Sequence, residues 1–292
     1  MKIRVPASSA NLGPGFDCFG IAWQLYNELD FELCGEGLSI SGCDYRYAND
    51  NNWAYVAYKA VLERCGIAPA GLRIHFGDCQ IPIGRGLGSS SALLVAGVMA
   101  ANELHGLGLS KQELLDVATV LEGHPDNVAP AIYGGLSASA MVAGKPVTVQ
   151  YPLSEKLRFT ALIPPFELST VEARRVLPQY VPREDAIFNI SRGALLLNAL
   201  GSGDTELIKV AMDDRLHQPY RIPLIAGYDI ARGLAYKCGA AATCISGAGS
   251  TLLCVSDSEA FAEKMVEASR FPLPDLRVLP LEVEHKGAYI VE

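Results

Sequence analysis

The chain has 292 residues, of which 50% are hydrophobic and 19% are charged, and its formal net charge is −8 at pH 7. This composition excludes a largely disordered chain and is sufficient for one large domain or two smaller ones. The acidic balance, with no basic run or stripe, argues against a protein that binds nucleic acid.

The sequence carries no sign of a membrane span or a secretion signal. Its longest clear apolar run, residues 92–101, is far shorter than the roughly 20 residues that cross a bilayer. Residues 1–6 contain no apolar signal region. The eight cysteines form no C-x-x-C pair and mostly have apolar neighbours, which is typical of reduced thiols. We therefore expect a cytoplasmic protein without a nucleic-acid or membrane partner.

The first half of the chain mixes predicted strands with predicted helices that end at glycines. In chain order we expect strands at 3–5 and 21–33, a helix from Trp53 to Gly66, a strand at 72–76, a helix from 92 to about His105, a helix that follows the capping box Ser110–Glu113 and ends at Gly123, and a short helix between His124 and Gly134.

The pattern changes at residues 151–154, where we place the boundary between two domains, residues 1–152 and 153–292. In the second domain we expect a strand at 159–163, helices at 184–200 and 205–212, strands near Cys244 and at 251–255, a helix after a second capping box at Ser256–Glu259, and a final strand at 276–283. Strands and helices do not alternate strictly, which favours an α+β fold over a doubly wound sheet.

The most informative segment is residues 81–92, Ile-Pro-Ile-Gly-Arg-Gly-Leu-Gly-Ser-Ser-Ser-Ala. Gly84, Gly86 and Gly88 leave backbone amides uncovered, and Ser89–Ser91 lead into an apolar helical run. Such a loop binds anions because free N–H groups converge there and the helix dipole adds positive potential. Its spacing matches neither the Walker A loop nor the dinucleotide fingerprint. A serine-capped turn without a ligand is the alternative.

Three separated motifs resemble those of one family of kinases. They are residues 6–20 (PASSANLGPGFDCFG), the loop from Pro82 to Ser90, and residues 245–251 (ISGAGST). The family is that of the GHMP kinases, which are named for galactose, homoserine, mevalonate and phosphomevalonate. The first motif and three further segments are similar to the homoserine kinases of this family: residues 122–130, 169–178 and 217–221.

This resemblance implies a two-domain α+β fold, with a first domain like domain 2 of ribosomal protein S5 and a ferredoxin-like second domain. It also implies transfer of a phosphoryl group from ATP to the hydroxyl of L-homoserine, with Mg²⁺, in threonine biosynthesis. A homodimer is usual in the family. One position departs from the family pattern, because Ser250 replaces the usual proline of the third motif. Serine loses some loop rigidity but keeps its backbone N–H, so we expect the function to survive.

The acceptor would be a small zwitterion, and the resemblance places six residues around it. Arg174 and Arg221 are the expected carboxylate ligands, because a guanidinium group matches a carboxylate with two hydrogen bonds. The other four are Asp17 and Asn11 at the ammonium group, Thr170 as a further hydrogen-bond donor and Asn127 at the hydroxyl. Without the resemblance, surface exposure, turn chemistry and helix capping would account for these residues.

The nucleotide would lie on the glycine loop. The expected ATP-binding residues are Pro82, Ile83, Gly84, Arg85, Gly86, Leu87, Gly88, Ser89, Ser90, Ser91 and Ala92. Ser90 and Glu122 are the expected Mg²⁺ ligands, because hydroxyl and carboxylate oxygens are hard ligands. A carboxylate at the end of a helix otherwise opposes the helix dipole. The sequence does not single out the residues of an adenine pocket.

Asn127 and Asp17 are the catalytic candidates. Asparagine is no base near neutral pH, so one hypothesis is catalysis by positioning and charge neutralisation, and the other is that Asp17 acts as the base. His124 is interpreted as a loop histidine outside the catalytic set.

Three other functions compete with this one. They are a related kinase for mevalonate, shikimate or a sugar, a non-catalytic ligand sensor on the same fold, and a dinucleotide-binding protein. Mevalonate and shikimate lack the ammonium group that Asp17 would bind. The complete set of site residues favours an enzyme over a sensor, and the glycine spacing disfavours a dinucleotide site.

Overall fold

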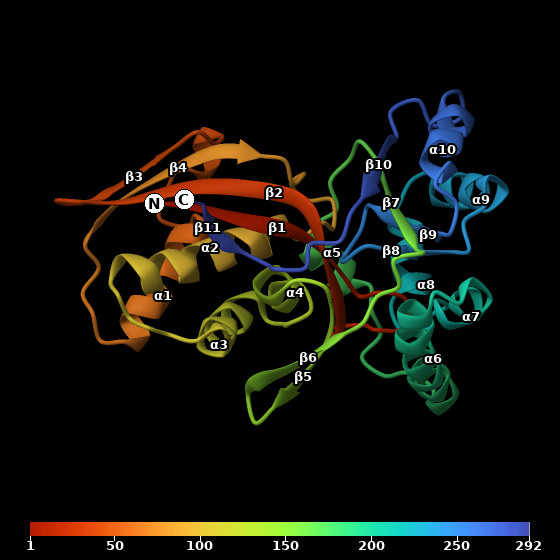
Figure 1. Ribbon diagram of the computed structural model, residues 1–292, viewed down its shortest axis with the longest axis horizontal. Coiled ribbons are helices and arrows are strands. Elements are labelled where there is room, and N and C mark those ends of the chain that lie inside the picture. The colour runs from red at the N-terminus through yellow and green to blue at the C-terminus, as the bar shows by residue number, and fades with distance from the viewer. Residues whose placement is uncertain (292) are drawn as a thin grey trace.

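Two β-sheets and the helices packed against them form the fold of residues 1–291, the part of the chain that this computed structural model describes (Figure 1). The first sheet contains β1 (Lys2–Ala10), β2 (Phe19–Cys34), β3 (Leu38–Ser41), β4 (Gly71–Cys79), β5 (Leu136–Val142), β6 (Lys145–Tyr151) and β11 (Tyr289–Val291). The second sheet contains β7 (Arg158–Ile163), β8 (Ala242–Ile245), β9 (Leu252–Ser256) and β10 (Arg277–Leu281).

The helices are distributed between the two sheets. They are α1 (Trp53–Arg64), α2 (Ser89–Leu104), α3 (Lys111–Glu122), α4 (Val128–Tyr133), α5 (Thr170–Arg175), α6 (Arg183–Ser202), α7 (Thr205–Ala211), α8 (Gln218–Arg221), α9 (Tyr228–Cys238) and α10 (Phe261–Ser269), with 3₁₀ turns at Tyr45–Tyr47 and Ile222–Leu224. Within residues 1–291, no helix combines the length and the apolar character that crossing a bilayer requires.

The first sheet has the strand order β11-β1-β2-β4-β3, and β5 pairs with both β2 and β6. Helices α1 to α4 lie together beneath it in Figure 1. The sequence of α2, SSSALLVAGVMAANEL, is apolar on all sides, and most of its residues are buried. A helix of this kind needs cover all round, and α2 packs against α1, α3 and β1. This packing fixes the direction in which the N-terminus of α2 points.

The second sheet is antiparallel with the order β10-β7-β9-β8. When its strands are numbered along the chain, the order is 4-1-3-2, which is the ferredoxin-like arrangement. The expected α+β fold, with a ferredoxin-like second sheet, is therefore confirmed.

A shared core joins the two sheets. Trp23 on β2 is fully buried, its indole N–H donates to Ser9 Oγ at 2.8 Å, and its ring lies 5.1 Å from that of Phe159 on β7. After β10 the chain returns to the first sheet, where Val291 of β11 pairs with Lys2 of β1. The division at 152/153 stays a prediction, and the last strand of the chain lies in the first sheet.

Most predicted helix ends agree with the structure to within a few residues, and the capping boxes differ in outcome. The box at Ser110 and Glu113 is present at the start of α3. The predicted box at Ser256–Glu259 is wrong, because α10 starts at Phe261 and the Ser256 hydroxyl donates instead to the carbonyl oxygen of Gly239. Helix α9 was not expected from the sequence.

Glycine in α2 allows α1 to approach closely. A Cβ on Gly97 would lie 2.1 Å from the carbonyl oxygen of Ala54, whereas a Cβ on Gly233 in α9 would meet nothing within 4 Å. We expect Gly97→Ala to lower the free energy of unfolding by about 2 kcal/mol through overpacking. Gly233→Ala is the matched control and should raise it by up to about 1 kcal/mol through helix propensity. Urea unfolding followed by circular dichroism measures both, and stabilisation by Gly97→Ala would contradict the α1–α2 packing.

Candidate functional site

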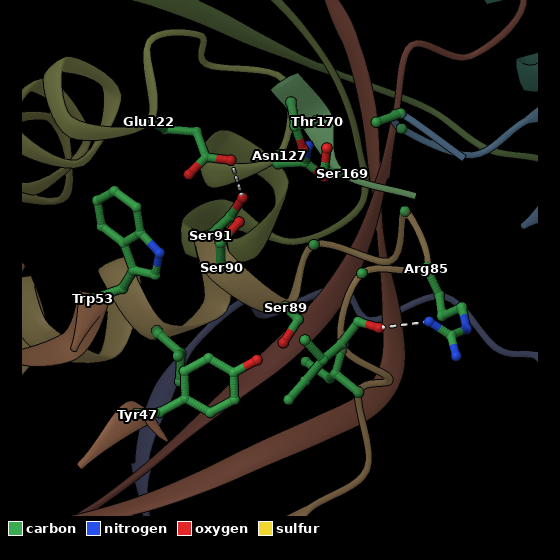
Figure 2. Close-up of a pocket in the computed structure, with 18 of the residues that line it drawn as sticks. Tyr47, Trp53, Arg85, Ser89, Ser90, Ser91, Glu122, Asn127, Ser169 and Thr170 are labelled. Atoms are coloured by element: carbon green, nitrogen blue, oxygen red, sulfur yellow. Dashed lines mark hydrogen bonds between the residues drawn. The ribbon is translucent and has the colours of Figure 1, made fainter. Parts of the chain in front are cut away.

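A cleft of about 650 Å³ brings the separated sequence motifs together. The phosphate loop (residues 82–92) and the third motif both contribute to its lining, as do Asn11 of the first motif and the arginines of α5 and α8. Figure 2 shows part of this cleft, where the serines at the start of α2 face Glu122 of α3. Residues far apart in the sequence thus form one site.

The phosphate loop has the backbone geometry of an anion site. Gly84, Gly86 and Gly88 have φ values of 65°, 73° and 72°, which favour glycine. Gly88 is the N-cap of α2, and no side chain caps the helix there. The first N–H groups of this helix therefore have no side-chain cap that competes with an anion. This result rejects the alternative of a serine-capped turn.

The predicted loop residues differ in how they meet the cleft. Arg85 lines the cleft, but its guanidinium group donates from Nε to the carbonyl oxygen of Pro164 at 3.1 Å and from Nη2 to that of Pro165 at 2.9 Å. Pro82, Leu87 and Ala92 are not among the described residues that line the cleft. Arg85 therefore ties the loop to the segment after β7, and the backbone of the loop is the part suited to phosphate.

The expected metal ligands lie beside each other at the start of α2. Glu122 Oε1 accepts a hydrogen bond from Ser91 Oγ at 2.8 Å, whereas Ser90 also lines the cleft next to them (Figure 2). Burial raises the pKa of Glu122, although His124 and the Ser91 hydrogen bond act in the opposite direction. A half-buried carboxylate next to serine hydroxyls provides the hard oxygen ligands that suit Mg²⁺.

The predicted acceptor residues also meet in the cleft. Arg174, Arg221, Asn11, Asn127 and Thr170 all line it. Two of them are cations, and burial together with the neighbouring Arg174 lowers the pKa of Arg221 to about 10. Both guanidinium groups remain charged at neutral pH, so this end of the cleft attracts a carboxylate.

Asp17 does not line the cleft and is paired with an arginine. Its two carboxylate oxygens accept hydrogen bonds from Arg174 at 2.6 and 3.1 Å. The ring of Phe16 lies 5.5 Å from the Arg174 guanidinium carbon and 5.2 Å from that of Arg221. One aromatic ring thus supports both cations.

The side chains of Asn127 and Thr170 do not cap a helix. Asn127 is the N-cap of α4, but its side chain makes no capping hydrogen bond, and its Oδ1 accepts from Ser8 Oγ at 3.0 Å. Ser169 rather than Thr170 caps α5, in a capping box with Glu172. The helix-capping explanation is therefore wrong for Asn127 and for Thr170.

Sequence reasoning missed His124, which lines the cleft. Its Nδ1 is hydrogen-bonded to Asp126. Burial lowers the pKa of His124, and the Asp126 carboxylate more than reverses this effect, so the pKa is raised. Asp17, His124 and Asp126 each bring one potential ligand atom to within 4.8 Å of the others. Nothing local in the sequence identifies this cluster, because Asp17 comes from a different loop.

Two aromatic residues also line the cleft, Tyr47 on the side of Ser89 and Trp53 on the side of Ser90 (Figure 2). Tyr47 is 40% exposed and Trp53 is 46% exposed. The sequence predicted Trp53 only as part of an apolar helix face. A large aromatic ring that stays half exposed at a cleft is available to stack on a flat ligand, and no spacing rule would have found this pair.

Comparisons with known proteins match two segments of the chain to family profiles. Residues 52–135 match the profile described as "GHMP kinases N terminal domain", and residues 196–274 match "GHMP kinases C terminal". A homoserine kinase of Clostridium botulinum is 46% identical over 253 residues, which cover 87% of this chain and 85% of the relative. A homoserine kinase of Clostridium beijerinckii is 39% identical and covers 100% of this chain and 99% of its own length.

Solved structures give the same picture. The homoserine kinase of Cytophaga hutchinsonii has a TM-score of 0.88 and 31% sequence identity, and the alignment covers 100% of this chain and 97% of that one. The mevalonate kinase of L. major, solved with R-mevalonate, has a TM-score of 0.74 at 17% identity over 98% of this chain and 96% of that one. This second likeness concerns the fold alone.

Gly88 provides a test of the phosphate loop. A Cβ at Gly88 would lie 2.3 Å from Ser8 Oγ and 3.2 Å from Asn127 Oδ1, whereas a Cβ at Gly106 would meet nothing within 4 Å. Both residues have positive φ, so alanine strains the backbone at either position by about 1 kcal/mol. We expect Gly88→Ala to weaken nucleotide binding at least about tenfold, because it displaces the loop as well.

The matched control is Gly106→Ala, which should leave nucleotide affinity within about twofold because it carries the same strain outside the loop. Isothermal titration calorimetry with a nucleotide measures both variants. Equal affinities in Gly88→Ala and Gly106→Ala would contradict the role of the loop.

Proposed function

The chain belongs to the GHMP kinase family, and on this basis we propose that it transfers the γ-phosphoryl group of ATP to the hydroxyl of L-homoserine, as a homoserine kinase does, in threonine biosynthesis. The observation that carries this proposal is the pair of cations, Arg174 and Arg221, in the same cleft as the phosphate loop. A kinase with such a pair suits an acceptor that bears a carboxylate. A neutral sugar would not require it.

The acceptor would bind by its two charged ends. Arg174 and Arg221 would hold the carboxylate, and Asp17 with Asn11 would attract the ammonium group. Asn11 supports this end because its Oδ1 accepts a hydrogen bond from the backbone N–H of Asp17 at 2.8 Å. Thr170, at the N-terminus of α5, would add a hydrogen bond to the acceptor. These contacts would hold the hydroxyl in line with the γ-phosphate.

The nucleotide would lie along the phosphate loop. Backbone N–H groups of residues 84–91 would bind its phosphates, and Tyr47 and Trp53 would stack on its base. Ser90 and Glu122 would hold Mg²⁺, and Ser91 would orient Glu122 through the observed hydrogen bond. The ion would neutralise charge on the transferred phosphoryl group.

Catalysis would rest on positioning more than on a base. Asn127 would hold the acceptor hydroxyl, and Ser8 fixes its Oδ1. Both Asp17 oxygens accept hydrogen bonds from Arg174, and this pairing supports a place for Asp17 at the charged end of the acceptor and not at its hydroxyl. Phosphoryl transfer tolerates this arrangement, because its transition state is loose and needs little proton transfer early.

Two wider properties stay proposals. A homodimer is usual in the family, so we expect this chain to form one. Analytical ultracentrifugation tests this expectation. A cytoplasmic location is supported by the eight cysteines, all of which are free thiols in the structure.

A substrate panel tests the proposed function directly. Purified protein with ATP and Mg²⁺ is assayed for ADP release on L-homoserine, D-homoserine, L-serine, mevalonate, shikimate and galactose. We expect turnover selective for L-homoserine, because only it combines the carboxylate, the ammonium group and the hydroxyl at the right separations with the L configuration. A chelator should abolish it. Selective turnover of mevalonate, shikimate or galactose would refute the acceptor, and nucleotide binding without any turnover would favour a sensor.

The catalytic candidates can be separated by kinetics. We expect Asp17→Asn to raise the homoserine KM about tenfold with kcat nearly unchanged, because it breaks the ion pair that orients Arg174. Asn127→Ala should instead lower kcat about a hundredfold, since it removes the contact to the reacting hydroxyl. Steady-state kinetics with varied homoserine distinguish the two effects.

The matched control is Glu259→Gln. It also removes a carboxylate from an ion pair, with Arg158 at 3.0 Å, but neither partner lines the cleft. It should leave both constants unchanged. A large loss of kcat in Asp17→Asn at constant KM would overturn the base-free mechanism and identify Asp17 as the base.

A further inference from the structure

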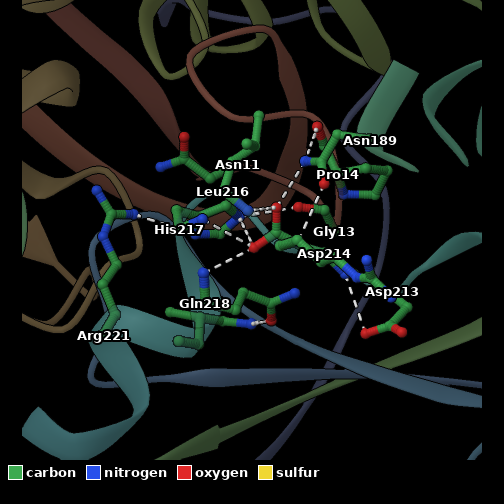
Figure 3. A network of polar contacts seen from close by, with 12 residues as sticks. Asn11, Gly13, Pro14, Asn189, Asp213, Asp214, Leu216, His217, Gln218 and Arg221 are labelled. Atoms are coloured by element: carbon green, nitrogen blue, oxygen red, sulfur yellow. Dashed lines mark hydrogen bonds and ion pairs between the residues drawn. The ribbon is translucent and has the colours of Figure 1, made fainter. Parts of the chain in front are cut away.

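A buried polar network lies behind Arg221, at the start of α8 (Figure 3). Its centre is the fully buried side chain of Asp214, which accepts hydrogen bonds from Asn189 Nδ2 at 2.7 Å and from the backbone N–H groups of Leu216, His217 and Gln218 at 2.9, 3.0 and 2.7 Å. Four donors satisfy this carboxylate. They fix the turn that leads from Asp214 into α8, and this turn carries His217.

The hydrogen bonds of His217 determine its tautomer. Its Nε2 lies 2.8 Å from the carbonyl oxygen of Gly13, which can only accept, so Nε2 carries the proton. Its Nδ1 is then an acceptor, and it lies 3.4 Å from Nη1 of Arg221, which can only donate. The ring is fully buried, and burial lowers the pKa of His217, in agreement with a neutral imidazole.

Arg221 is held on three sides. Its Nε donates to the carbonyl oxygen of Ala173 at 3.1 Å, and its Nη1 donates both to Gly247 at 3.0 Å and to His217. No hydrogen bond among residues 1–291 engages its Nη2. Nη2 therefore remains available for a ligand, and Arg221 lines the cleft.

The ring of Phe16 supports both His217 and Arg221 from one side. The ring of Phe16 stacks on that of His217, with centroids 5.4 Å apart, and also lies under the Arg221 guanidinium group. Gly13 and Phe16 both belong to the first loop of the chain. His217 therefore joins this loop to the cation of α8.

Building on the proposed function, we infer that His217 is a positioning residue for the acceptor carboxylate. It holds Arg221 in place by accepting a hydrogen bond at Nδ1, while its Nε2–H is anchored on the first loop. The neutral Nδ1 accepts one hydrogen bond from the guanidinium group of Arg221 and leaves the positive charge of this group in place. A carboxylate in the same position would neutralise that charge. The full charge of Arg221 therefore remains available to the substrate at Nη2.

Two isosteric amides separate the roles of the two ring nitrogens. In His217→Gln the terminal amide lies where Nε2 was, so the bond to Gly13 can persist and the acceptor for Arg221 is lost. In His217→Asn the amide oxygen lies where Nδ1 was, so the acceptor can persist and the bond to Gly13 is lost. Both variants lose the stacking on Phe16 equally, so this loss is matched between them.

We expect His217→Gln to raise the homoserine KM about tenfold, the usual size for one hydrogen bond to a charged group. His217→Asn should raise it less than about threefold. Both variants should keep kcat at saturating homoserine and the ATP KM within about twofold of wild type, because the phosphate loop is not involved. A purely structural role would change all three constants together with the melting temperature.

Several results would contradict a positioning role for His217. Equal homoserine KM values in the two variants, or a common fall in kcat and ATP affinity, would overturn the inference. If neither variant folds, Phe16→Leu tests the same support at a half-buried position, and it should raise the homoserine KM about fivefold at constant kcat. An unchanged KM there would also overturn it. Wild-type protein that fails to phosphorylate homoserine would instead refute the proposed function itself.

Discussion

The backbone contact between two glycine-bearing loops is the constraint on which the cleft depends. Gly86 lies so close to the carbonyl oxygen of Ser246 that a Cβ there would be 2.1 Å away. The Ser246 hydroxyl donates to the carbonyl oxygen of Gly86 and accepts from the Ser9 hydroxyl, each at 2.6 Å, and the N–H of Gly247 donates to the carbonyl oxygen of Ala10. Two loops and the end of β1, from distant parts of the chain, are thus joined. The walls of the cleft keep their separation because these loops cannot slide.

The charge of the site runs against the charge of the chain. The protein carries a net charge of −8, yet both substrates proposed for its cleft bear anionic groups, the phosphates of ATP and the carboxylate of the acceptor. Local potential resolves this conflict, because the amides at the start of α2 and the two arginines on Phe16 act at short range, where a distant surface charge is screened. Asp17 offsets one cation and leaves the other in excess.

Local features of the site were predictable, and long-range pairs were not. The glycines of the phosphate loop and the capping box at Ser110 depend on neighbouring residues, so the sequence alone identifies them. The pairing of Asp17 with Arg174 spans 157 positions and depends on how the two sheets pack. The residues expected to bind the acceptor could be predicted only from the family resemblance, and not from residue types alone. They gave no hint that Ser256 would bond Gly239 instead of capping a helix, since that partner arrives through the sheet.

The pairing of β11 with β1 has a consequence for how the protein is made. Residues 289–291 complete one edge of the first sheet, but they leave the ribosome after nearly all the rest of the chain. At about 5–20 residues per second, β1 waits for many seconds with unpaired N–H and C=O groups along its edge. The first half of the protein can collapse during synthesis, but its sheet is finished only after residues 289–291 have been made. Nascent chains of this protein are therefore most vulnerable to edge-to-edge association before these residues emerge from the ribosome.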